Sequence, residues 1–74
     1  MTIEDLRAQL GWSKKKLCEE ADIDMSTLQR AINGEPVYRA TAGKLATAFN
    51  RELAKRGEPA NIRYTDFEGV HFAD

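Results

Sequence analysis

A short polar stripe between residues 25 and 33 carries the side chains best suited to recognising another molecule. Apolar residues at helical spacing predict a helix here, with an inward face made by Leu28, Ala31 and Ile32. The opposite face would present four side chains to solvent: Met25, Ser26, Gln29 and Arg30. Three of the four can donate or accept hydrogen bonds, so this face favours hydrogen-bonded recognition over bond-making chemistry.

Bond-making chemistry has few candidate residues in this chain. Cys18 is the only cysteine and His71 the only histidine, and they lie far apart in the sequence. One cysteine excludes an internal disulfide and a cysteine-based zinc cluster. No glycine loop is suited to cradling a phosphate, and no acid and base form a convincing pair. We therefore expect a small buried Cys18, a solvated His71, and neither catalytic residues nor a metal or cofactor.

The length and composition are those of one small globular domain. A chain of 74 residues, 42% hydrophobic and 31% charged, has material for a single core. No apolar run approaches the roughly 20 residues that span a bilayer, and the N-terminus is acidic, so we expect a cytoplasmic protein without membrane contact.

The net charge of −1 is distributed unevenly along the chain. Residues 12–56 contain nine Lys and Arg against six Asp and Glu, giving +3, whereas residues 57–74 contain one against four, giving −3. A basic middle and an acidic tail support nucleic-acid binding only weakly, because the charge of a sequence segment does not fix the charge of a surface.

Two short helices are predicted before the polar stripe. Ile3, Leu6 and Leu10 predict a helix over residues 2–10, with Thr2 as its N-cap and Gly11 as its end. Ser13 can then cap a second helix over residues 14–21, and Asp24 can cap the third after the turn Asp22-Ile23-Asp24. Asn33-Gly34 would end the third helix. Two helices joined by a three-residue turn can present the second helix to the major groove of DNA.

At this point the sequence resembles a known family. The run from Gly11 to Gly34, GWSKKKLCEEADIDMSTLQRAING, resembles the helix-turn-helix of Cro/C1-type (XRE-like) phage and bacterial repressors. The resemblance continues through Pro36-Val37, Thr41-Ala42 and Leu45–Phe49, and covers about two thirds of the chain. Three positions depart from the usual pattern: Lys14 in place of an amide side chain, Cys18 in place of Ala, and Asp22 in place of Gly.

The resemblance implies a role for individual residues. The residues implied to face base edges are Met25, Ser26, Gln29 and Arg30. The residues implied to contact phosphates are Lys14, Thr27, Asn33 and Arg39. Among these, Arg30 can bind guanine through two hydrogen bonds and Gln29 can bind adenine, whereas Met25 either contacts a thymine methyl group or simply packs.

The rest of the chain predicts one long helix and a short tail. The long helix would start at Tyr38 or Thr41 and run to Arg56, with Gly57 as terminator. Alternation of Ile62 and Tyr64 with polar residues predicts a short strand. Because a lone strand needs a partner, it would pair with a later part of the tail or, as we favour, with the same strand of a second subunit.

These patterns predict a mainly α protein. We expect a compact four-helix (or five-helix) repressor-like helix-turn-helix domain, with residues 1–57 binding DNA and residues 58–74 forming a C-terminal extension that is a short strand or irregular. The expected function is that of a sequence-specific regulator of bacterial or phage origin, a repressor of the Cro or antitoxin size class, bound as a homodimer to a near-palindromic double-stranded operator. The alternative is a protein-interaction adaptor that binds a protein partner through residues 60–74.

Overall fold

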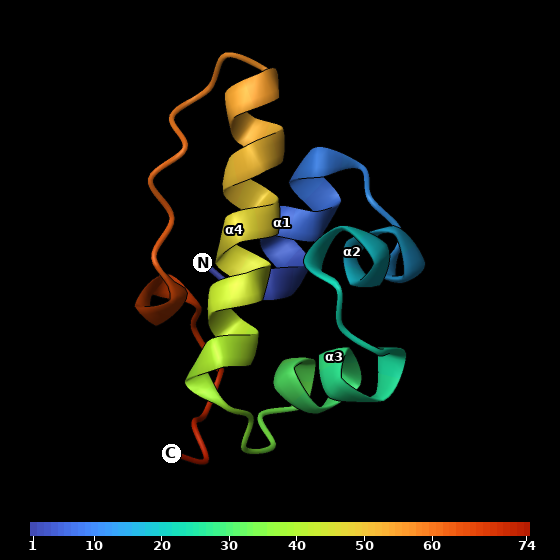
Figure 1. Ribbon diagram of the computed structural model, residues 1–74, viewed down its shortest axis with the longest axis vertical. Helices are drawn as coiled ribbons and strands as arrows, with labels where there is room; N and C mark the ends of the chain where they lie inside the picture. The colour runs from blue at the N-terminus through green and yellow to red at the C-terminus, as the bar shows by residue number, and fades with distance from the viewer.

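The computed structural model describes residues 1–74 and contains four α-helices. Their bounds are α1, Ile3–Leu10; α2, Lys14–Ala21; α3, Met25–Ile32; and α4, Arg39–Lys55. A single 3₁₀ turn, η1, follows at Tyr64–Asp66. Figure 1 shows α4 as the longest element, with α1 and α2 on one side of it and the C-terminal segment running back along the other. The mainly α fold with an irregular tail is therefore confirmed.

Local capping explains where the first three helices begin. The Thr2 side chain accepts a hydrogen bond from the Asp5 amide, the Ser13 hydroxyl from the Lys16 amide, and the Asp24 carboxylate from the Thr27 amide. Each bond satisfies one of the free amides in the first turn of a helix. The three caps are the residues predicted from the sequence. By contrast Tyr38, the N-cap of α4, makes no side-chain capping bond.

The corner between α2 and α3 depends on a left-handed residue. Asp22 has φ 56° and ψ 51°, and it is the one non-glycine residue with a positive φ. The resembled family usually has Gly at this position. The corner forms with Asp as well, but the backbone of Asp22 is in a conformation that glycine adopts more readily. Lys44 Nζ lies 3.5 Å from the Asp22 carbonyl oxygen, which places a cation at the C-terminal end of α2.

One hydrophobic core holds the helices together. Its largest fully buried side chains are Leu6, Leu17, Leu28, Leu45 and Phe49, so all four helices contribute to it. The Trp12 ring stacks on Phe49 with centroids 6.1 Å apart. α2 packs against both α3 and α4, which fixes α3 from its buried side. No helix of the structure is both long enough and apolar enough to cross a bilayer.

The strand predicted around Ile62 and Tyr64 is wrong. Ile62 instead exchanges two hydrogen bonds of 2.9 Å with the side-chain amide of Asn50 on α4, and the chain turns into η1 at Tyr64. Further along, Phe72 forms an isolated parallel bridge with Val37. Backbone groups of the tail therefore bond to α4, to Val37 in the loop before it, to the carbonyl of Met1 and to one another within η1.

Candidate nucleic-acid interface

The outer face of α3 is open to solvent while its inner face is buried. Leu28 and Ala31 are 0% and 1% exposed, whereas Met25 is 41% exposed. Ser26 and Arg30 are exposed, and Gln29 and Thr27 are half-buried. Ala73 of the C-terminal segment lines a hollow with Thr27 and Arg30, and Ser26 and Arg30 nevertheless stay exposed. The structure thus places the four predicted base-contacting side chains on one accessible helix.

Two of these side chains already have partners within the chain. Arg30 Nη2 donates a hydrogen bond of 2.7 Å to the carbonyl oxygen of Pro36, in the loop that follows α3. The Ser26 hydroxyl donates a hydrogen bond of 3.2 Å to Asp24 Oδ2. A guanidinium has five N–H donors, so Arg30 keeps most of its donors for another molecule while one of them orients it.

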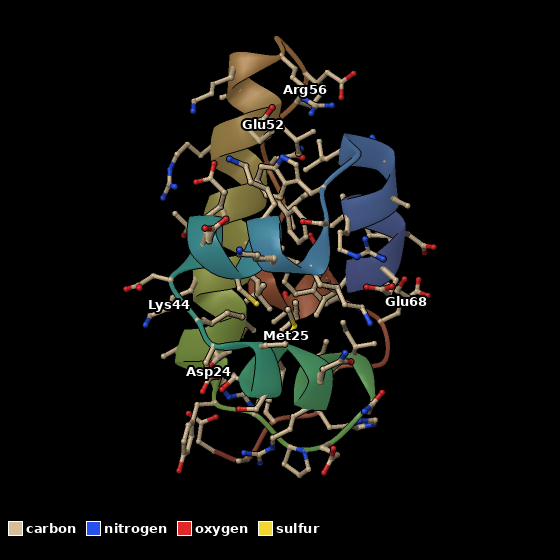
Figure 2. The ribbon with its side chains drawn as sticks, turned by 90° about the vertical axis from the view of Figure 1, so that its right-hand side faces the viewer. Asp24, Met25, Lys44, Glu52, Arg56 and Glu68 are labelled. Atoms are coloured by element: carbon tan, nitrogen blue, oxygen red, sulfur yellow. The ribbon has the colours of Figure 1, made fainter.

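The Asp24 carboxylate stays ionised at the start of α3. Hydrogen bonds from the side chain and then the backbone of Thr27, with a further one from Ser26, lower the pKa of Asp24 below its ordinary value of 3.8. Figure 2 looks at the molecule from the side of α2 and α3 and labels Asp24 at the beginning of α3, next to Met25. A fixed negative charge here repels phosphates. It would therefore lower the affinity of this face for any DNA backbone that other contacts do not hold in position.

A shallow hollow lies between α3 and the start of α4. It brings together Thr27, Arg30, Pro36, Val37, Tyr38, Thr41 and Ala73. Two of these were predicted as site residues, Thr27 and Arg30. The sequence indicates only a capping role for Tyr38, yet its side chain is 65% exposed and makes no capping hydrogen bond. Its place just before a helix that follows a Pro-containing loop was the available signal.

The predicted phosphate-contacting residues lie on α2, at both ends of α3 and at the start of α4. Lys14 is the first residue of α2 and is half-buried, and Asn33 is exposed at the C-terminal end of α3. Arg39 is exposed at the first position of α4, but it is held by the tail. Its guanidinium lies 4.6 Å from the centre of the Phe72 ring and 3.9 Å from the Asp74 carboxylate. This engagement was not predicted.

Cys18 and His71 lie in different surroundings in the structure. Cys18 is buried in the core at 8% exposure, and desolvation is the main cause that raises the pKa of its thiol, which keeps it protonated. His71 Nδ1 lies 2.9 Å from the Gly34 carbonyl oxygen, on the loop after α3. The two side chains thus contact different parts of the chain.

The comparison with known proteins agrees with this geometry. A family model described as helix-turn-helix matches residues 3–56, which is most of the chain. The chain therefore belongs to the Cro/C1-type (XRE-like) helix-turn-helix family, a DNA-binding regulatory family and not an enzyme family. No match was found among curated proteins or among solved structures.

Proposed function

We propose that this protein recognises a specific sequence of double-stranded DNA by laying the outer face of α3 in the major groove. The observation that carries the proposal is the division of α3 into a fully buried side, Leu28 and Ala31, and an open polar side that ends in Arg30. A helix held in this way can meet base edges without any rearrangement of the core.

Each residue of the open side has a proposed task. Arg30 binds a guanine through two hydrogen bonds, and the Pro36 carbonyl supports this by orienting the guanidinium. Gln29 binds an adjacent adenine, and Met25 contacts a thymine methyl group. Ser26 contributes a polar contact close to its partner Asp24. A correct bidentate contact discriminates between bases by about 1 to 3 kcal/mol.

The phosphates on either side would be held by a second group of residues. The proposed contacts come from Lys14, Thr27, Asn33 and Arg39, on α2, on α3 and at the start of α4. Contacts of this kind fix the position of a protein on the duplex and carry no sequence information. We propose that residues 1–57 do the binding and that residues 58–74 are an extension packed on them.

The biological role we propose is that of a small repressor which binds as a homodimer. Two copies related by a twofold axis would place their α3 helices about 34 Å apart, and the operator would be near-palindromic with half-sites about one turn apart. An adaptor that binds a protein through residues 60–74 has less support, because Phe67 is buried and Ile62, Val70 and Phe72 already pack on the core.

Selection from a pool of random duplexes tests the proposal directly. We expect enrichment of one short motif with two similar halves, and we expect Arg30→Ala to relax the preference at one base position in each half. Lys55→Ala serves as the matched control, since Lys55 is an exposed cation at the other end of α4 from α3. It should leave the motif unchanged. Failure to enrich any motif at low salt would reject sequence-specific binding.

A further inference from the structure

The last residues of the chain lie along the loop that leads into α4. The Val37 amide donates a hydrogen bond of 3.0 Å to the His71 carbonyl, and the Ala73 amide donates one of 2.8 Å to the Val37 carbonyl. Figure 1 shows this red segment beneath the N-terminal end of α4, next to the loop from α3. The tail therefore ends beside the edge of the proposed interface.

Asp74 occupies the N-terminal end of α4. The Arg39 amide donates a hydrogen bond of 3.0 Å to Asp74 Oδ1, and Arg39 Nε lies 3.9 Å from the same oxygen. The Arg39 guanidinium also lies over the Phe72 ring, 4.6 Å from the centre of that ring. Because Tyr38 makes no capping bond, Asp74 supplies the anion that this helix end would otherwise lack.

A DNA phosphate would need the same groups. A helix-terminal amide and a guanidinium bind a phosphate as readily as a carboxylate, and Arg39 is a proposed phosphate contact. Tyr38 and Ala73 are the chain neighbours of Arg39 and Asp74, and both line the hollow beside Arg30. The Asp74 carboxylate and a DNA phosphate would therefore compete for Arg39 at the place where the DNA backbone is proposed to pass.

We propose that Phe72 and Asp74 form an intramolecular latch that competes with the DNA backbone for Arg39 and so lowers the affinity of the protein for DNA. The proposal rests on the proposed function. Arg39 and Asp74 are 48% and 49% exposed, and exposed ion pairs are weak, so a phosphate can displace this one. The bridge at Val37 can remain while Asp74 moves aside.

The latch is tested by measuring DNA affinity at fixed salt for two matched variants of the full chain. Asp74→Ala and Glu58→Ala each remove one carboxylate from residues 58–74, but Glu58 has no side-chain partner. We expect Asp74→Ala to tighten binding by about threefold, as for loss of one exposed competing pair, and Glu58→Ala to change it by much less. In an Arg39→Ala background, Asp74→Ala should give no gain.

Each other outcome overturns the latch. Equal gains from the two variants would mean that only the charge of the tail matters, and a gain that persists without Arg39 would place the effect elsewhere. If wild type and variants bind DNA equally well, the latch fails while the proposed function stands. If none of them binds any duplex, the proposed function itself fails and the latch fails with it. Thermal unfolding of both variants checks that they are folded. Asp74→Asn keeps a hydrogen-bond acceptor, so it should give a smaller gain in DNA affinity than Asp74→Ala.

Discussion

The ring of Phe67 packs edge-on against Phe49, with centroids 5.9 Å apart and planes inclined by 62°. Phe49 in turn stacks on Trp12, the only tryptophan of the chain. A residue of the C-terminal extension thus completes an aromatic cluster whose other members lie in the matched family region. The extension is part of the core that supports α3.

Removal of this ring should destabilise the whole domain. Phe67 is 5% exposed, so Phe67→Ala should lower the free energy of unfolding by about 3 kcal/mol or more through lost burial and an unfilled cavity. Urea unfolding followed by Trp12 fluorescence measures this change. Tyr64→Ala is the control, because Tyr64 is 36% exposed and should cost much less. Equal costs for the two variants would show that the buried Phe67 ring contributes no more to stability than the partly exposed Tyr64 ring.

The left-handed corner gives a prediction about Asp22. Asp22→Ala should destabilise the fold by about 1 kcal/mol, because a β-carbon without a polar group is disfavoured at φ 56°. Asp22→Gly should be neutral or stabilising, since glycine adopts this conformation without steric cost. Thermal unfolding of the three proteins checks the order. An Asp22→Ala variant as stable as Asp22→Gly would contradict the strain.

The Asp24 cap predicts a pH dependence of stability. Because hydrogen bonds hold the pKa of Asp24 below 3.8, its ionised form stabilises the fold above about that pH, and this contribution is lost as the pH falls through the lowered pKa. Asn also caps helices but does not titrate. The melting temperature of wild type relative to Asp24→Asn should therefore fall between about pH 6 and about pH 2.5. A difference that stays constant over this range would be the contrary result.

Lys14 predicts a dependence on salt. If Lys14 neutralises one phosphate, Lys14→Ala should weaken binding to all duplexes to a similar extent and reduce the slope of log affinity against log salt by about 0.9. Fluorescence anisotropy at several salt concentrations measures the slope. Lys55→Ala removes the same charge near Arg56, which Figure 2 shows at the opposite end of α4 from Lys44 and Asp24, and it should leave the slope nearly unchanged.

Local interactions made the first three helices predictable. Thr2, Ser13 and Asp24 each bond an amide three residues ahead, so a short stretch of sequence contains both partners of the cap. The apolar spacing that buries Leu28 on α3 is equally local. The sequence does not decide between Tyr38 and Thr41 as the start of α4, and in the structure the N-cap is Tyr38, which makes no side-chain capping bond.

The tail could not be predicted in the same way, because its partners are distant in sequence. Ile62 bonds the side chain of Asn50, and Phe72 bridges to Val37, 35 residues earlier in the numbering. Alternation of apolar and polar residues describes a strand only when another strand supplies its hydrogen bonds. In this chain an amide side chain on α4 supplies them, and nothing in residues 58–74 alone indicates that.

The division of α3 into a buried side and an open side also bears on how the proposed DNA recognition can change during evolution. Leu28 and Ala31 anchor the helix, while Met25 and Gln29 make no side-chain hydrogen bond within the chain. Substitutions at positions 25 and 29 would therefore remove no side-chain hydrogen bond from the fold. If α3 reads a DNA sequence as proposed, single substitutions at these positions would change the preferred sequence without a prior gain of stability to compensate for them.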